Sequence, residues 1–135
     1  MRERVPSAVC QGVARLADFR LTLDKRGADG SGKANLRAAP GEAVFGVVYA
    51  IDPDHWGALD RFEPDYMRIA VAIDLAGASV AAQTYRSERT AREAVCFAAY
   101  KRLIVEGARE HSLPDDWQRW LATLPARDDP RRRTR

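Results

Sequence analysis

The chain has 135 residues, 46% of them hydrophobic, and a formal net charge of +3. This length suits a single domain with a real core and leaves little for a second one. No run approaches the ~18 apolar residues of a membrane span, and residues 1–4 lead into no apolar segment typical of a secretory signal. We therefore expect a cytoplasmic protein that has no membrane partner.

The positive charge is concentrated at the end of the chain. Residues 127–135 hold five arginines and two aspartates, whereas residues 1–126 hold equal numbers of basic and acidic groups. Such a tail could touch nucleic acid, but charged ends of this kind are more often solvated and disordered. We expect one domain over residues 1–126, a basic disordered tail over 127–135, and no nucleic-acid partner.

The first half of the chain predicts β structure. Residues 9–16 and 19–23 are expected to be strands, with a break near Ala17-Asp18. The stretch 25–33, KRGADGSGK, is rich in glycine and predicts a loop.

A turn, a strand and a short helix are expected next. Pro40-Gly41 signals a turn. Residues 43–50 then predict a strand, one face of which carries Phe45, Val47 and Tyr49. The stretch 52–63 predicts a helix, because Asp52 can cap its start and Pro53 suits its first position.

Two further strands are predicted around a glycine. Residues 67–74 alternate regularly, and the apolar positions are Met67, Ile69, Val71 and Ile73. Gly77 is expected to turn the chain into a second strand over 80–86.

The last third predicts helices. Residues 93–111 carry a stripe at helical spacing, made of Cys96, Tyr100, Leu103 and Gly107. Residues 113–116 open a second helix with a proline and two acidic residues, and its apolar positions are Trp117, Trp120, Leu121 and Leu124. Strands followed by helices indicate an α+β domain, whose sheet could curl into a small barrel.

The reactive residues are few. Cys10 and Cys96 are the two cysteines, and we expect both to be buried free thiols. His55 and His111 form no cluster with metal-ligand spacing, so a zinc site is not expected. Spacing leaves a Ser-His-Asp or Cys-His arrangement open, although nothing in the sequence supports one.

The glycine-rich loop approaches a phosphate-binding motif without completing it. Gly27 is followed after four residues by Gly32-Lys33, but Ala34 stands where the motif needs Ser or Thr to bind magnesium. The motif also needs a helix that begins at the lysine, and Pro40 follows too soon for one. Nucleotide binding is therefore the weakest of the functional alternatives, and a hairpin connection is expected.

Five segments in order resemble the γ-glutamylcyclotransferase family, the group that includes the AIG2-like proteins. They are PSAVCQGVARLADFRLTL, FGVVYAIDPDHWGALDRFE, TYR at residues 84–86, AAYKRLIV, and EGAREHSLP. The resemblance implies a mixed fold, a small β-barrel with flanking helices, and an enzyme that needs no cofactor or metal. It implies that Glu63 is the catalytic acid/base and that Tyr100, Tyr66 and Tyr85 contact the substrate.

Two departures from the family pattern affect these expectations. Pro64-Asp65 follows Glu63, where family members usually have Gly. Met1 matches an internal helix of the family, so we expect the family's first strand and its Tyr-Gly-Ser-Asn loop to be missing. The alternative to an enzyme is thus a non-catalytic AIG2-like binding or scaffold protein that has lost its substrate loop.

The reaction implied by the resemblance is the cyclisation of a γ-glutamyl amino acid or amine, glutathione included, to 5-oxoproline with release of the amine. One carboxylate could move both protons, and Phe62 suggests an apolar surround that would raise the pKa of Glu63. From pattern alone, Glu63 would instead be a solvated partner of Arg61 or Arg68, and the three tyrosines would be ordinary core and strand residues. The identity of the leaving amine and the oligomeric state stay open.

Overall fold

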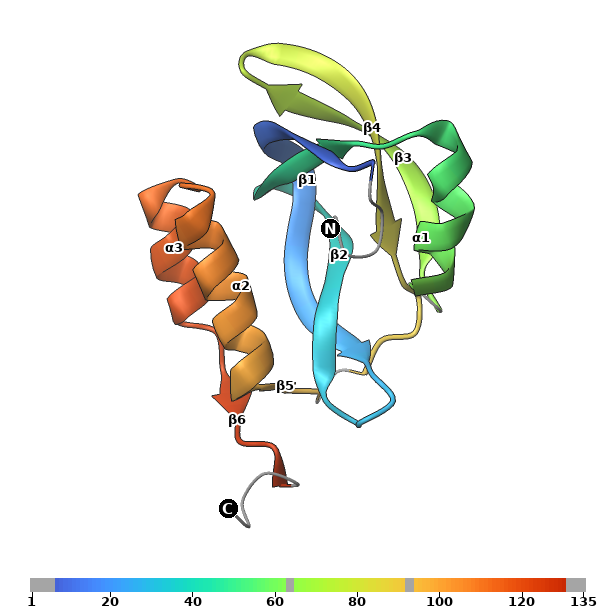
Figure 1. Ribbon diagram of the computed structural model, residues 1–135. Helices are drawn as coiled ribbons and strands as arrows, with labels where there is room; N and C mark the ends of the chain where they lie inside the picture. Colours follow the sequence, from blue (N-terminus) through green and yellow to red (C-terminus); the bar gives the residue numbers. More distant parts are fainter. Residues whose placement is uncertain (1–6, 63–64, 92–93, 131–135) are drawn as a thin grey trace.

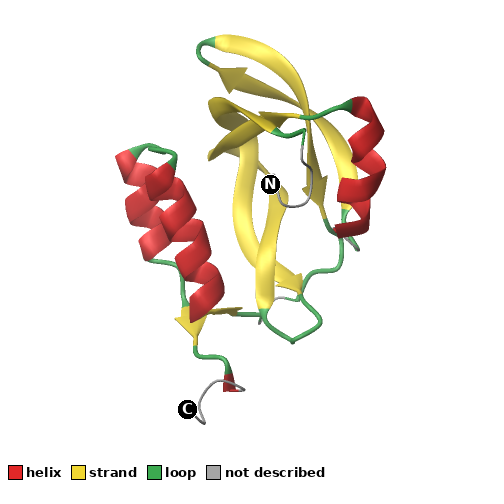
Figure 2. Ribbon diagram, viewed as in Figure 1, coloured by secondary structure: helices red, strands yellow, loops and turns green. Residues whose placement is uncertain are grey.

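The computed structural model describes residues 7–62, 65–91 and 94–130. Its elements in chain order are β1 (Val9–Arg26), β2 (Gly32–Ala50), a 3-10 turn (Pro53–His55), α1 (Trp56–Phe62), β3 (Met67–Leu75), β4 (Ala78–Arg86), β5 (Cys96–Phe97), α2 (Ala98–Glu110), α3 (Asp115–Ala122) and β6 (Ala126–Arg127). Strands precede the main helices, as Figure 2 shows. The expected α+β class is confirmed.

Four strands form one antiparallel sheet in the order β2-β1-β3-β4. Two long hairpins, β1-β2 and β3-β4, are joined through only two residue pairs, Ala14 with Leu75 and Arg15 with Asp74. The sheet curls, but within the described part of the chain no pairing joins β2 to β4. The barrel is therefore open along that side.

Both faces of the β1-β2 hairpin are covered. Its inner face packs with β3 and β4 around a core of Ala14, Leu16, Leu36 and Ile73. Its outer face is covered by α2 and α3, which lie side by side (Figure 1) and contribute the core residues Ala108, Leu113 and Leu121. The short helix α1 lies on the opposite side of the molecule beside β3 (Figure 1) and closes one end of the inner core through Leu59.

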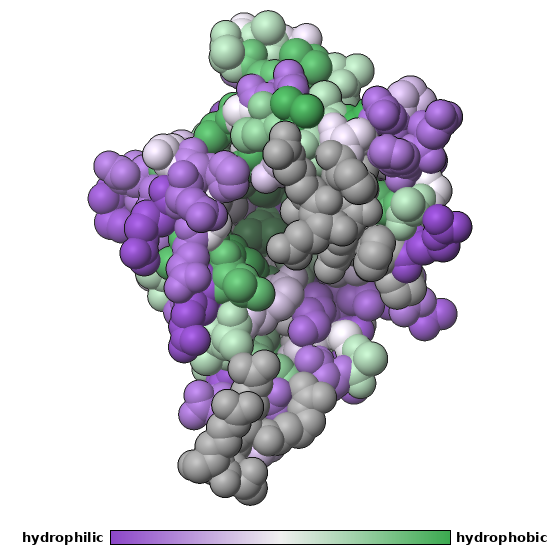
Figure 3. Space-filling model, in the orientation of Figure 1, coloured by the Kyte–Doolittle hydropathy of each residue, from purple (hydrophilic) through white to green (hydrophobic). Residues whose placement is uncertain are grey.

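The surface follows the same division. In Figure 3 the outward faces of α1, α2 and α3 are mostly hydrophilic, and hydrophobic side chains gather between α2 and the sheet. No helix among the described residues is long and apolar enough to cross a membrane.

The break predicted near Ala17-Asp18 is an irregularity inside one continuous strand. Asp18 has a positive φ of 65°, and its carboxylate accepts a hydrogen bond from the Gly41 backbone N–H at 3.0 Å. The pairing register shifts across this point, where Gly41 has a φ of +85°. The turn predicted at Pro40-Gly41 is therefore wrong: these residues form a bulge within β2.

The first short helix begins as predicted, with Pro53 in its first turn. Asp52 occupies the capping position, but its side chain makes no capping hydrogen bond. In β3 the predicted alternation is confirmed for Ile69, Val71 and Ile73, whereas Met67 at the strand start is 51% exposed.

The helix predicted from residue 93 begins only at Ala98, and Arg92 and Glu93 lie outside the described residues. Cys96 lies in β5, which pairs in parallel with β6, and so it does not belong to the helix. Leu103 is 70% exposed, because the buried face of α2 is centred on Ala108. The predicted stripe is wrong at these two positions.

The two cysteines differ. Cys96 is fully buried, as expected, and burial raises the pKa of its thiol. Cys10 is exposed, which corrects the expectation that both thiols are buried. It lies beside a register shift near the start of β1, where the strand pairs irregularly with β2.

The loop between β1 and β2 is held by Asp29. Its carboxylate accepts hydrogen bonds from the side chain and backbone N–H of Ser31, at 2.6 and 2.9 Å, and pairs with Lys33 at 3.3 Å. These bonds, with the Ser31 hydroxyl first, lower the pKa of Asp29 to about 2.

Asp29→Asn is expected to lower the free energy of unfolding by about 1–2 kcal/mol at pH 7. Because the folded pKa lies below the unfolded one, this contribution is present above about pH 4 and is lost as the pH falls toward 2. Urea unfolding of both proteins between pH 2 and 7 measures it. The exposed Asp54 supplies a control, Asp54→Asn; the same pH trend in that control would mean that the effect is not specific to the loop.

Candidate functional site

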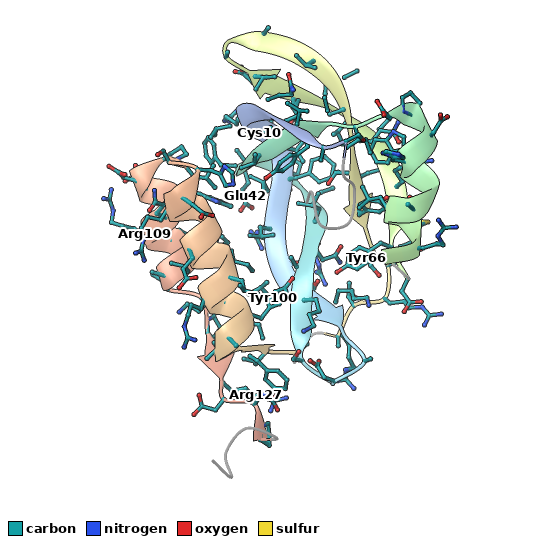
Figure 4. All side chains as sticks on the ribbon, in the orientation of Figure 1. Cys10, Glu42, Tyr66, Tyr100, Arg109 and Arg127 are labelled. Atoms are coloured by element: carbon teal, nitrogen blue, oxygen red, sulfur yellow. The ribbon has the colours of Figure 1, made fainter. Side chains whose placement is uncertain are left out.

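Tyr66 and Tyr100 meet at one residue of β2. The Tyr66 hydroxyl donates a hydrogen bond to the Ala34 carbonyl oxygen at 2.7 Å, and the Tyr100 hydroxyl accepts one from the Ala34 backbone N–H at 3.0 Å. The two tyrosines approach β2 from opposite sides (Figure 4). Residues 32 and 66 positions from Ala34 in sequence thus converge there.

The elements around this point explain the convergence. Tyr100 lies in the first turn of α2, and Tyr66 immediately precedes β3. The N–H of Gly32 donates to the carbonyl of Val95 at 2.9 Å, which ties the start of β2 to the segment that leads into α2. The helix is therefore anchored two residues away from Ala34.

Each of these tyrosines also carries a lysine over its ring. The Lys33 ammonium lies 4.7 Å from the centroid of the Tyr100 ring, and that of Lys25 lies 5.2 Å from the centroid of the Tyr66 ring. Both distances fit cation–π contacts. The pair of tyrosines is therefore embedded in a cationic environment.

Tyr85 lies apart from the Ala34 contact, at α1. Its hydroxyl donates to the Asp60 carboxylate at 2.5 Å. Asp60 also pairs with Arg68 at 3.8 Å, and the Arg68 guanidinium lies 4.7 Å from the centroid of the Trp56 ring. The structure thus brings Tyr85 to the helix that precedes Glu63 in sequence.

The Tyr85 side chain lines the larger of two pockets. This pocket has a volume of about 720 Å³ and occupies the space inside the curled sheet, bounded at the α1 end by Trp56, Leu59 and Tyr49. Its remaining lining is mainly aliphatic and comes from β1 to β4. It can exclude water from a group that lies at the α1 end.

A buried amide holds the chain that follows Glu63. The side chain of Asn35, which is 3% exposed, donates to the Ser87 carbonyl at 2.9 Å and accepts from the Ser87 backbone N–H at 2.9 Å. The Ser87 hydroxyl then donates to the carbonyl of Asp65 at 2.8 Å. Asp65, which has a positive φ of 68°, is thereby fixed against both hairpins.

Glu63 and Pro64 lie outside the described residues, so the structure places neither the proposed acid/base nor its carboxylate. The described residues on either side are Phe62, which ends α1, and Asp65. Arg68, one of the two ion-pair partners considered for Glu63, has Asp60 as an ionic partner.

The glycine-rich loop does not have the geometry of a phosphate-binding loop. It runs only from residue 27 to 31 and joins two strands, so no helix follows Lys33. Its backbone N–H groups are used internally: Gly27 donates to Ser31, Gly30 donates to Gly27, and that of Ser31 goes to Asp29. The expected hairpin connection is confirmed, and the structural basis for nucleotide binding is absent.

Within residues 7–62, 65–91 and 94–130, no group of three His, Cys, Asp or Glu side chains lies close enough to hold a metal ion.

Several residues around the site were not found from the sequence. Lys25 was placed in a loop, yet it lies in β1 and is 7% exposed. Asn35 and Ser87 are separated by 52 residues, and Asp60 is one of many surface-type acids. A buried polar residue in a strand gives no local signal beyond a break in the apolar alternation.

Comparison with known proteins agrees with this arrangement. Residues 43–121 match the model of the AIG2-like family. The chain is 31% identical over 136 residues to the γ-glutamylcyclotransferase of Bos taurus and 29% identical over 135 residues to that of Homo sapiens, and each match covers 93% of this chain and 71% of the relative.

A solved structure of a γ-glutamyl cyclotransferase superposes with a TM-score of 0.87 at 28% identity, over 94% of this chain and 80% of that one. The family match covers more than half of the chain, and the relatives match almost all of it. The chain therefore belongs to the AIG2-like family and is a γ-glutamylcyclotransferase-like protein.

Proposed function

We propose that the chain converts a γ-glutamyl amino acid or γ-glutamyl amine into 5-oxoproline and releases the amine, with Glu63 as the general acid/base and Tyr100, Tyr66 and Tyr85 as substrate contacts. The observation that carries this proposal is the similarity to γ-glutamylcyclotransferases along 93% of the chain. The convergence of Tyr66 and Tyr100 on Ala34 supports it from the geometry.

The reaction needs little from the protein beyond positioning and proton transfer. The α-amine of the substrate attacks its own γ-carbonyl carbon, so a new C–N bond closes a five-membered ring and the bond to the leaving amine breaks. Both reacting groups belong to one molecule, and folding the substrate into the ring-closing conformation supplies most of the proximity. No redox step occurs, and water is not consumed.

Two proton movements remain for Glu63. Its carboxylate takes a proton from the α-ammonium group of the substrate and delivers one to the leaving nitrogen. An apolar surround favours this work, because it raises the pKa of a carboxyl group toward neutral pH. The large apolar pocket at the α1 end, next to the helix that Glu63 follows, is the part of the fold that can supply such a surround.

Among the tyrosines, Tyr100 is the best suited to stabilise the developing oxyanion. A hydroxyl that accepts one hydrogen bond keeps its own proton for donation, and the Tyr100 hydroxyl acts as acceptor toward Ala34. The Tyr66 and Tyr85 hydroxyls already donate, to Ala34 and Asp60. We therefore assign the substrate-polarising role to Tyr100 and lining roles to the other two.

Purified protein incubated with γ-glutamyl-L-alanine, glutathione and a γ-glutamyl alkylamine tests the proposal directly. We expect 5-oxoproline and free amine in equal amounts from at least one of the three. Heat-denatured protein serves as the blank. If no compound gives 5-oxoproline, the chain is a non-catalytic AIG2-like binding protein.

Tyr100→Phe is expected to lower kcat by about 10²-fold, because the variant keeps the ring but loses the hydroxyl proton. It also removes the acceptor for the Ala34 N–H, so the free energy of unfolding should fall by about 1 kcal/mol. Tyr66→Phe removes the other hydroxyl bonded to Ala34 and is the matched variant. Rate losses of equal size in the two would contradict a special role for Tyr100.

A further inference from the structure

Lys25 is buried to an extent that is unusual for a lysine. The residue is 7% exposed, although lysine is almost never fully buried unless it is paired. Its one ionic contact among the described residues is with Asp65, at 3.9 Å, which is too long for a hydrogen bond. Asp65 is shared, since Arg89 approaches its other oxygen at 3.5 Å.

This ammonium belongs to the second pocket, which has a volume of about 570 Å³. Its charged lining residues are Lys25, Arg26, Arg89 and Asp65, so the lining carries a formal excess of positive charge. A buried charge without full compensation is costly in the empty protein. The pocket is therefore suited to bind an anion.

The wall of the pocket is built and not a loose surface. Thr90 forms a β-bridge with Lys25, and the N–H of Ala91 donates to the carbonyl of Asp24 at 2.7 Å. Asp65 is fixed from below by the Ser87 hydroxyl. The segments that carry the charges are thus held in place by the sheet.

The pocket adjoins the site proposed above. The Lys25 ammonium lies against the face of the Tyr66 ring, and Asp65 follows Glu63 by two residues in the sequence. In a γ-glutamyl amino acid, the carboxylate of the leaving group is attached to the carbon bonded to the scissile nitrogen. A substrate that lies along Tyr66 would extend this carboxylate toward Lys25.

We propose that the pocket of Lys25 and Arg89 binds the carboxylate of the leaving group, so that the preferred substrates are γ-glutamyl amino acids and not γ-glutamyl amines without a carboxylate. This inference rests on the proposed function and narrows its substrate class. Lys25 acts as the specificity-determining residue, with Arg89 adding charge at the rim.

The test compares γ-glutamyl-L-alanine with γ-glutamyl-L-alaninamide, which differs only in the charge of the leaving group. We expect kcat/KM to favour the acid by about tenfold to a hundredfold, the range for a hydrogen bond to a charged group. In Lys25→Met the acid-to-amide ratio should fall to about 1, and in Lys25→Arg it should be largely restored.

Lys101→Met is the control. It also removes one ammonium, but that of Lys101 donates to the Ala122 carbonyl at 2.7 Å, between α2 and α3. The ratio should stay at the unmodified value in this variant. An unmodified protein without a preference, or a Lys25→Met variant that slows both substrates equally, would overturn the proposal and make Lys25 a structural residue.

Calorimetric binding of the two compounds separates this inference from the proposed function. If neither compound yields 5-oxoproline, the cyclisation proposal fails, yet tighter binding of the acid that is lost in Lys25→Met would still support the carboxylate site. If the unmodified protein binds both equally or binds neither, the carboxylate site is overturned whether or not turnover occurs.

Discussion

Glu63→Gln is expected to reduce 5-oxoproline formation by about 10²- to 10⁴-fold, the usual range for the loss of one general acid/base. Glutamine keeps the size and the hydrogen-bonding capacity of the side chain but cannot carry the proton. Substrate affinity should change little. The free energy of unfolding should hold or rise, because a carboxylate in an apolar surround carries a desolvation cost.

The control for this variant is Glu42→Gln. Glu42 is an exposed carboxylate of β2 that pairs with Arg20, and its removal should leave turnover unchanged. If Glu63 were only an ion-pair partner, Glu63→Gln would keep its activity and lose up to ~1 kcal/mol of stability. Turnover assays and thermal unfolding on the same preparation decide between the two, and retained turnover removes Glu63 from the mechanism.

Gly32→Ala is expected to be the most damaging substitution in the fold. A Cβ atom at this position would lie 2.0 Å from the backbone oxygen of Leu23, and backbone cannot move aside as a flexible side chain can. We expect a loss of about 3 kcal/mol in the free energy of unfolding and a melting temperature lower by about 10 °C. The Ala34 contact, two residues on, should be disturbed as well.

Gly46→Ala provides the matched control on the same strand. A Cβ at Gly46 would meet no atom within 4 Å, and alanine restricts the unfolded chain more than glycine does. This variant should be as stable as the unmodified protein, or more stable by about 0.5–1 kcal/mol. Chemical unfolding of the two variants side by side is the measurement, and equal stabilities would show that Gly32 has room for a side chain.

The sequence predicted best the elements whose signals are local. The alternation of Ile69, Val71 and Ile73 indicated β3, and Pro53 indicated the start of the first short helix; both were confirmed. Pro40-Gly41 carried an equally local turn signal, but pairing with β1 keeps the chain extended through this point and converts the turn into a bulge. Local propensity yields there to the hairpin register.

Other features depend on residues far apart in the chain and have no local signal. Cys96 was assigned to a helix, because its strand consists of two residues that pair with β6 about thirty positions later. The burial of Lys25 depends on Asp65 and on the segment that follows Ser87. The candidate site itself was predicted through the family resemblance, since Tyr66, Tyr85 and Tyr100 read singly as ordinary core and strand residues.

The central claim is that ring closure, and not hydrolysis, releases the amine. Reaction of γ-glutamyl-L-alanine in ¹⁸O-labelled water, followed by mass spectrometry of the products, tests it most directly. Our account predicts 5-oxoproline and alanine in equal amounts, with no ¹⁸O in either at early times. Glutamate that carries ¹⁸O in its γ-carboxylate would show that water is the nucleophile and would contradict the account.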